Sequence, residues 1–348
     1  MKVHKPHFIF LSLCVPVLLF VTWTLAIQLH ADSNMSGDQQ QDSDQVVWDA
    51  NTVQLKSEEV KPGVYAVIPT EAHDKVPQGQ PAATSGGFIV GERGVLVVDT
   101  MLSARLAAQL IGLIREVTDL PIRYIVNTSY HGDHCYGNYV FPKTACVIQH
   151  PATRDYIAEY FDQDRAFMMQ YFGRGRGIEE VVPRDADLLV EDNLTIDLGG
   201  ISVEIRHFGF AQTDGDLFVY VPAREVLFTG NPLIAKKPAL PWLLDGRHRE
   251  SLATMRAVQD SLSANATVVP GHGLPMTRDD MTFTIDYLST LDRVVAAAIK
   301  EGLTLEQTVE RTETALEDFK GYALWGWVHA QVNVPAAYHA LSEAKSDP

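Results

Sequence analysis

The pattern of hydrophobic and polar positions alternates between short apolar runs and amphipathic stretches from about residue 60 onward. Apolar runs bounded by glycine, proline or aspartate are typical of buried strands, whereas apolar residues spaced three and four apart are typical of helices. We expect strands or hairpins at residues 64–69, 87–99, 122–127, 145–149, 194–209, 216–230 and 267–270. We expect helices at residues 103–117, 152–162, 246–263, 277–299, 303–314 and 330–345. Strand-rich halves that alternate with helices predict an α/β sandwich.

One stretch within this pattern has two interpretations. Residues 167–177, FMMQYFGRGRG, are first apolar and then rich in glycine and arginine. They can form a helix that ends in a loop, or a lid over a pocket. We favour the first, because irregular loops are usually connectors.

The N-terminal segment, residues 1–31, is apolar and carries no acid. Residues 8–27 contain no charge and follow Lys2 and Lys5. This run is about as long as a membrane span and longer than the core of a usual signal peptide. The segment is therefore either a cleaved signal peptide or an uncleaved membrane anchor. Both interpretations export the rest of the chain, to the periplasm or to a membrane-anchored position outside the cytoplasm.

Polar residues separate this segment from the patterned part of the chain. Residues 32–55 begin with DSNMSGDQQQDSDQ, a composition typical of a flexible tether. Residues 56–348 then carry the predicted strands and helices as one domain. The apolar fraction of 46% is ordinary for a globular protein with a hydrophobic core.

The charge of the chain restricts its partners. The formal net charge is −16, and because residues 1–31 hold two lysines and no acid, residues 32–348 carry 26 − 44 = −18. Such an acidic surface argues against nucleic acid or an anionic membrane surface as the main partner. We expect a small-molecule substrate, with membrane contact only through an uncleaved N-terminal segment. The sequence does not indicate the oligomeric state.

Two cysteines, Cys135 and Cys146, lie outside the N-terminal segment. In an exported protein they could form a disulfide. Two free thiols are the alternative, because the sequence alone does not fix the distance between their Cα atoms.

Candidate chemistry begins in a loop that directly follows a predicted buried strand. The loop, residues 127–138, reads NTSYHGDHCYGN and holds His131, Asp133 and His134 within four positions. Imidazole nitrogen suits zinc, and two imidazoles with one carboxylate make a three-ligand site with an open position. Far downstream, VVPGHG places His272 between two glycines after another predicted strand. These residue types predict a metal site.

Four motifs in their order along the chain resemble the metallo-β-lactamase superfamily: NTSYHGDHCYGN, AQTDGDLFVYVP, VLFTGN and VVPGHG. The resemblance covers roughly residues 60–275. It implies an αββα sandwich with a metal site at one edge between the two sheets, followed in this chain by a helical C-terminal extension.

The family's loop pattern, H-x-H-x-D-H, belongs to two metal sites joined by a bridging aspartate. By this resemblance the second site is intact, with Asp133, His134 and His272 as its ligands. The first site keeps only one histidine. The resemblance places Ser129, His131 and Gln212 at its three ligand positions and Asn231 at the bridging aspartate. We therefore expect one zinc ion per chain. Cys135 and His207 are possible substitute ligands, because they are close to these motifs in sequence.

The substituted positions become candidates for contact with the substrate. His131, without a metal to bind, can act as a general base or orient the attacking water, and Asp133 can share that role. Asn231, Gln212 and Ser129 can donate hydrogen bonds to a developing oxyanion. In the family, the residue at Asp99 braces the metal loop. Asp214 and Asp216 are typical of a turn, and the pair Lys236 and Lys237 either attracts a substrate carboxylate or is solvated.

These features favour an exported hydrolase that cleaves an ester, lactone, thioester or amide with metal-activated water. Two alternatives stay open. The chain could be a non-catalytic binding or accessory protein of the same fold whose metal site has degenerated. It could also be an isomerase or lyase that uses the same pocket without hydrolysis, because a fold does not determine a function.

Overall fold

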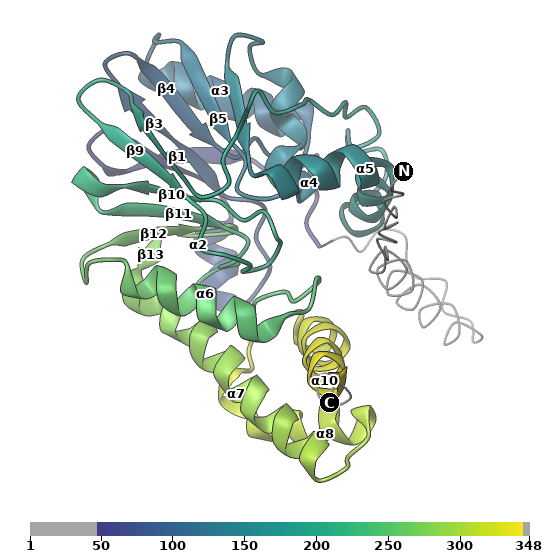
Figure 1. Ribbon diagram of the computed structural model, residues 1–348. Coiled ribbons are helices and arrows are strands. Elements are labelled where there is room, and N and C mark those ends of the chain that lie inside the picture. The colour runs from purple at the N-terminus through teal and green to yellow at the C-terminus, as the bar shows by residue number, and fades with distance from the viewer. Residues whose placement is uncertain (1–46, 344–348) are drawn as a thin grey trace, which may run out of the picture. The chain divides into compact units, whose positions relative to one another are not determined.

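The computed structural model describes residues 47–343, which form two β-sheets packed face to face between helices (Figure 1). The segment expected to be a signal peptide or anchor, residues 1–31, lies outside the described residues, as do residues 32–46 and 344–348. Among residues 47–343, no helix has the length and hydropathy that a bilayer span needs.

The first sheet has seven strands in sequence order. Its strands are β1 (Leu55–Lys61), β2 (Val64–Pro69), β3 (Gly86–Gly91), β4 (Gly94–Val98), β5 (Ile122–Val126), β6 (Cys146–Gln149) and β7 (Leu188–Leu189). Strands β1 to β4 pair antiparallel, and β4 to β7 pair parallel. The carboxyl ends of β4, β5 and β6 therefore meet at one edge, and the loop after β5 carries the predicted metal ligands.

The second sheet has six strands in the order β13-β12-β11-β10-β9-β8. Its strands are β8 (Asn193–Asp197), β9 (Ser202–Arg206), β10 (Phe218–Val221), β11 (Val226–Gly230), β12 (Thr267–Pro270) and β13 (Met276–Thr277). Strands β11 and β12 run parallel, whereas the other neighbours run antiparallel. Asn231 follows β11 and His272 lies two residues after β12, so both lie at the same edge of this sheet.

Two apolar layers hold the sandwich together. Between the sheets, Ile89 and Leu96 of the first sheet pack in one cluster with Val219 and Phe228 of the second. On the outer face of the first sheet, a second cluster joins its side chains to α3 (Ala104–Val117) and α5 (Pro151–Phe172). Helix α6 (His248–Asp260) lies beside the second sheet (Figure 1). The layers follow the αββα order that the resemblance implies.

Local sequence explains why α3 forms where it does. Ser103 caps its first turn by accepting a hydrogen bond from the backbone N–H of Leu106. Leu106, Leu110 and Ile114 are spaced four apart and are all buried, so one face of the helix packs on the sheet.

The C-terminal extension is helical, as predicted, and it reaches back to the sandwich. It contains α7 (Thr282–Lys300), α8 (Leu305–Ala315), α9 (Trp325–Trp327), a π-helical turn at Val328–Asn333 and α10 (Val334–Glu343). In the π turn, the amide of Asn333 donates to the Pro241 carbonyl at 2.8 Å and its side-chain carbonyl accepts from the Leu243 N–H at 3.0 Å. The Ala323 N–H donates to the Gly79 carbonyl at 2.8 Å. The extension therefore holds two loops that border the candidate site.

Several expectations need adjustment. Helix α5 continues ten residues beyond its expected end at 162, so residues 167–177 are a helix that ends in a loop, with Gly173 at φ 89°. Residues 47–55 of the predicted tether pack on the domain, because Trp48, Ala50 and Val53 are buried in the outer cluster. Cys135 and Cys146 are free thiols in the structure, so they do not form the disulfide that was one of the two alternatives.

Candidate metal centre

The loop that carries the predicted metal ligands gets its shape from a single helical turn, α4 (Gly132–Cys135), which follows β5 after an intervening stretch of five residues, 127–131. The turn buries Asp133 and His134. A Cβ atom at residue 132 would lie 2.5 Å from the ring of Tyr136, so only glycine fits there. The one-residue bridge between Thr84 and His272 joins the two sheets at the same edge. Tight backbone geometry therefore brings two distant segments to one point.

Asp133, His134 and His272 converge at that point. Their ligand atoms all lie within 4.8 Å of one another, and all three side chains are buried. The Asp133 Oδ2 atom lies 3.6 Å from His134 Nε2 and 3.4 Å from His272 Nε2. Two imidazole nitrogens and one carboxylate oxygen at such separations fit the donor set and size of a zinc site. The residues that the sequence predicts as ligands therefore suit the metal that the family implies.

Each ligand is held by a second group, so its orientation is fixed. His134 Nδ1 lies 2.7 Å from Asp99 Oδ2, and His272 Nδ1 lies 3.1 Å from the Ala82 carbonyl. The hydroxyl of Thr84 donates to Asp133 Oδ2 at 2.6 Å. Because both Nδ1 atoms face acceptors, the Nε2 atoms of both histidines are the ones that point into the site.

Asp99 is the main brace of the loop. It follows β4 with φ 61°, and its carboxylate accepts hydrogen bonds from the backbone N–H and the hydroxyl of Thr128, each at 2.8 Å, besides facing His134. A carboxylate is suited to this place because it accepts from three donors at once. The bracing role that the family resemblance assigns to Asp99 matches these contacts.

Replacing Asp99 by asparagine is expected to lower the free energy of unfolding by about 3 kcal/mol and zinc affinity by about 10–100-fold. The side-chain NH₂ group of the new asparagine would face a hydrogen-bond donor, because the Thr128 N–H, the Thr128 hydroxyl and His134 Nδ1 all donate to Asp99. Urea denaturation and calorimetric zinc titration measure the two effects. Asp197→Asn, at an exposed strand end, is the matched control. Native values of both quantities in Asp99→Asn would contradict the bracing role.

Burial and neighbouring charges set the protonation of the site. Burial opposes the charge of His134, yet the carboxylates of Asp133 and Asp99 raise its pKa to about 9. Burial lowers the pKa of His272 to about 4 and that of His131 to about 4. Burial also opposes the charge of Asp133, but His134 and His272 lower its pKa. His131 is thus neutral at physiological pH and a weaker base than its ordinary pKa implies.

The substituted positions are buried beside the three ligands. Ser129, His131, Gln212 and Asn231 are all buried. Within the described part of the chain, His131 Nε2 and the Gln212 side-chain carbonyl have no hydrogen-bond partner. Buried polar atoms without partners are uncommon in folded proteins and are candidates for contact with a ligand or water. The Gln212 amide instead donates to the Trp242 carbonyl at 3.0 Å, and Ser129 Oγ accepts weakly from the His131 N–H at 3.4 Å.

The two possible substitute ligands are engaged elsewhere. The Cys135 thiol donates to the Tyr130 carbonyl at 3.3 Å, and burial raises its pKa. His207 Nδ1 lies 2.9 Å from the Asp216 carbonyl, and its ring stacks on that of His150. Neither joins the group of metal ligands found among the described residues.

Asp216 organises a turn, as the sequence predicts for this segment. Its carboxylate accepts from the backbone N–H groups of Ala211, Gln212 and Thr213. The contact with the Gln212 N–H is 2.6 Å long. Asp216 therefore fixes the backbone at the position where the family has its third first-site histidine.

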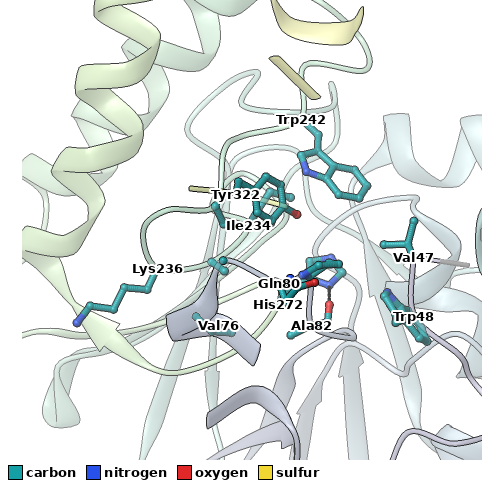
Figure 2. Close-up of a pocket in the computed structure, with 14 residues that line it drawn as sticks. Val47, Trp48, Val76, Gln80, Ala82, Ile234, Lys236, Trp242, His272 and Tyr322 are labelled. Atoms are coloured by element: carbon teal, nitrogen blue, oxygen red, sulfur yellow. Dashed lines mark hydrogen bonds between the residues drawn. The ribbon is translucent and has the colours of Figure 1, made fainter. Parts of the chain in front are cut away.

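A narrow pocket opens beside His272 (Figure 2). Aromatic side chains of Trp48, Trp242 and Tyr322 line it, together with aliphatic groups. Figure 2 shows Lys236 extending away from His272, and its ammonium group pairs with Asp280 at 3.1 Å. The pocket therefore has mainly apolar walls with one imidazole in its lining.

Sequence patterns missed several residues that shape the site. Thr84 belongs to no motif, and Trp48 and Tyr322 lie outside the four motifs altogether. Tyr130 lies inside the loop motif NTSYHGDHCYGN, and what the sequence misses is its partners: Tyr130 donates to Asp245 at 2.5 Å, and its ring stacks on His131 with 4.7 Å between centroids. Burial raises the pKa of Asp245 to about 7. Only the folded chain brings these residues to the metal ligands.

Comparison with known proteins identifies the architecture. The sequence model of the metallo-beta-lactamase superfamily matches residues 79–272, more than half of the chain. A metallo-beta-lactamase from Pontibacter korlensis is similar in structure, with 18% identity, a TM-score of 0.53 and coverage of 68% of this chain and 99% of that one. An inverting sec-alkylsulfatase from a Pseudomonas species has 18% identity and a TM-score of 0.66 over 84% of this chain, which spans only 52% of the sulfatase. At these identities the solved structures show the fold alone.

Proposed function

This chain belongs to the metallo-beta-lactamase superfamily, and from that premise we propose that it is a mono-zinc hydrolase. The observation that carries the proposal is the convergence of Asp133, His134 and His272 on one buried point. Zinc, when bound by these side chains, would polarise a carbonyl group and lower the pKa of water. The substrates we propose are small molecules with an ester, lactone, thioester or amide bond.

The chain's own residues would divide the remaining work. His131 is neutral and its Nε2 atom has no partner among the described residues, so it can accept a proton from the attacking water. Asp133 can share that role through its second oxygen. Gln212, Asn231 and Ser129 lie at the positions that we assign to substrate contact and oxyanion stabilisation.

The acidic surface supports a small-molecule substrate rather than nucleic acid, because residues 32–348 carry a formal charge of 26 − 44 = −18. The uncharged run at residues 8–27 supports export, and we propose a periplasmic or membrane-anchored location for the domain. An uncleaved run would be the one contact of the chain with a membrane.

A second candidate function is a non-catalytic accessory protein. One observation favours it: Asn231 stands where the family has its bridging aspartate, and the loss of that charge weakens metal binding. Metal content separates the two candidates, since an accessory protein with a degenerate site binds no zinc at stoichiometric level.

Elemental analysis of the purified full chain after zinc loading and desalting tests the proposal. We expect about one zinc per chain and hydrolysis of at least one member of a panel of p-nitrophenyl esters, lactones and thioesters. A chelator should remove the activity, and added zinc should restore it. Less than about 0.2 zinc per chain under saturating conditions would contradict the hydrolase and favour the accessory protein. Stoichiometric zinc without hydrolysis in the panel would favour the isomerase or lyase alternative.

A further inference from the structure

The pocket beside His272 is built partly from segments outside the region that matches the family model, residues 79–272. Trp48 comes from the chain before β1, and Tyr322 comes from the loop before α9. The other apolar walls come from residues 76–82 and 234–242, and they include Val76, Ala82, Ile234, Ala239 and Trp242. Two of the three aromatic walls are therefore additions of this chain to the matched region.

Contacts outside the pocket hold two of these aromatic walls in place. The ring of Trp48 packs on Phe172, with 4.8 Å between the ring centroids. The ring of Trp242 packs edge-on against Trp327, with 5.1 Å between the centroids. Both rings thus have fixed neighbours before any ligand enters, as expected of a preformed binding pocket.

The third aromatic wall, Tyr322, reaches the pocket through a close contact between two glycines. A Cβ atom at residue 79, where φ is 71°, would clash with the Gly321 carbonyl oxygen. One residue after Tyr322, the Ala323 N–H donates to the Gly79 carbonyl at 2.8 Å. The backbone on both sides of Tyr322 is therefore fixed against the loop that leads to Ala82.

The size and charge of the pocket restrict its ligand. Its cavity volume is about 10 Å³, close to the room that one water molecule needs, so a group that enters must be slim. Among the described lining residues only Lys236 has a fully charged side chain, and this side chain extends away from His272 and pairs with Asp280 at 3.1 Å (Figure 2). A buried carboxylate would have no cation to face and would bind poorly. Each buried methylene group, in contrast, raises affinity about fourfold.

One polar atom in the walls is available to a ligand. The indole N–H of Trp242 is buried and makes no hydrogen bond to a described residue. Burial raises the pKa of Tyr322 and Trp242 lowers it, so the two side chains are close, but their geometry is not that of a hydrogen bond. A neutral carbonyl or ether oxygen of a ligand suits this N–H, because it accepts without bringing a charge into the pocket.

We propose that the pocket beside His272 binds a neutral, unbranched aliphatic chain next to the bond that is cleaved. The substrates are then esters, thioesters or amides of unbranched apolar groups that carry no carboxylate. The chain enters with small side-chain rotations at the rim, which is common when ligands bind. This inference rests on the proposed hydrolase and names the class of its substrate.

The first test measures binding to the full-length chain by NMR and needs no enzyme activity. Hexanamide should move the ¹⁵N indole signals of Trp48 and Trp242, assigned by their loss in Trp48→Phe and Trp242→Phe. The signal of Trp325, which lies outside the lining, should stay in place. Hexanamide should bind at least about 10-fold more tightly than the monoamide of adipic acid, which ends the same chain in a carboxylate, and than 2,2-dimethylpropanamide. Unmoved signals, or equal binding of the three amides, would overturn the inference.

Two variants change the pocket in opposite directions. Ala239→Leu adds bulk to the lining and should reduce hexanamide affinity about 10-fold. Trp48→Ala removes one wall and should raise the affinity for 2,2-dimethylpropanamide about fivefold, a gain that an unfolded variant cannot show. Trp325→Phe is the control and should keep both affinities. Native affinities in both pocket variants would show that the amides bind elsewhere and would contradict the inference.

Hydrolysis by the zinc-loaded chain identifies which side of the bond enters the pocket. The p-nitrophenyl ester of hexanoic acid and the p-nitrophenyl monoester of adipic acid test the acyl side, whereas hexyl acetate and 6-acetoxyhexanoate test the alcohol side. We expect kcat/KM to be at least about 10-fold higher for the uncharged member of one pair. A chain that hydrolyses these esters without preference in either pair would contradict the inference.

The binding and hydrolysis tests separate this inference from the proposed function. If the indole signals respond to hexanamide but no ester is hydrolysed, the proposed hydrolase fails and the pocket stands as a binding site for a neutral chain. If esters are hydrolysed but the indole signals do not respond, the inference about the pocket fails alone.

Discussion

The triple variant Ser129→His, Gln212→His and Asn231→Asp is expected to bind about two zinc ions per chain, against the one that we propose for the native chain. His131 Nε2 already lacks a partner among the described residues, so one ligand of a first metal site is present. Imidazoles at residues 129 and 212 would supply the other two nitrogens, and a carboxylate at residue 231 would bridge the two ions. The three changes act on one site, so we expect their effects to be strongly non-additive.

Elemental analysis and calorimetric titration of the triple variant measure this outcome. The three single variants are the controls, and each should stay near one zinc per chain because none completes a three-ligand set. A triple variant that folds, as judged by circular dichroism, and still holds one zinc would show that these positions do not correspond to the family's first site.

Hydrophobic periodicity was sufficient to predict the long helices and strands, but it was insufficient to predict the short or exposed strands. The burial of Leu106, Leu110 and Ile114 on one face of α3 is a direct consequence of their spacing. Strand β1, LKSEEVK, has mostly half-exposed polar residues and lies at a sheet edge, so it has no apolar run to detect. Strands β7 and β13 have two residues each, which is too short for any period.

The residues of the candidate site likewise divide into those that the sequence could identify and those that it could not. Asp133 and His134 share one short loop, and His272 is marked by its flanking glycines, so all three could be named from sequence. Thr84 could not be named, because its role depends on the bridge that places residue 84 beside His272. Trp48 and Tyr322 reach the pocket from segments before and after the family's matched region.

His131 illustrates a limit of a different kind. Its sequence neighbours identify it as a candidate base, and the ordinary pKa of histidine, near 6.5, suits that role. In the folded chain, burial lowers its pKa to about 4, although Asp133 acts in the opposite direction. Desolvation depends on the packing of the whole loop, including the ring of Tyr130, and the residue type alone does not show it.

Asp133→Asn is expected to reduce zinc affinity by at least about 100-fold and to remove the proposed hydrolytic activity with it. Asp133 is the one anionic member among the three ligands, and it is buried, so water cannot replace its charge. The variant should also lower the pKa of His134, because among the neighbouring groups the Asp133 carboxylate makes the largest contribution to raising that pKa. Zinc titration by calorimetry and histidine titration by NMR measure the two effects.

Asp164→Asn separates this effect from the general loss of a buried carboxyl group. Asp164 is buried, accepts a hydrogen bond from Tyr136 at 2.5 Å and has a pKa raised by burial to about 7, but it is not among the metal ligands. Its replacement should leave zinc affinity within about threefold of native, because the ligand set is intact. If Asp164→Asn loses zinc as completely as Asp133→Asn, the loss comes from the packing of the loop, and Asp133 is not a ligand. If only Asp133→Asn loses zinc, the carboxylate beside His134 and His272 holds the ion, and the proposed chemistry depends on that one charge.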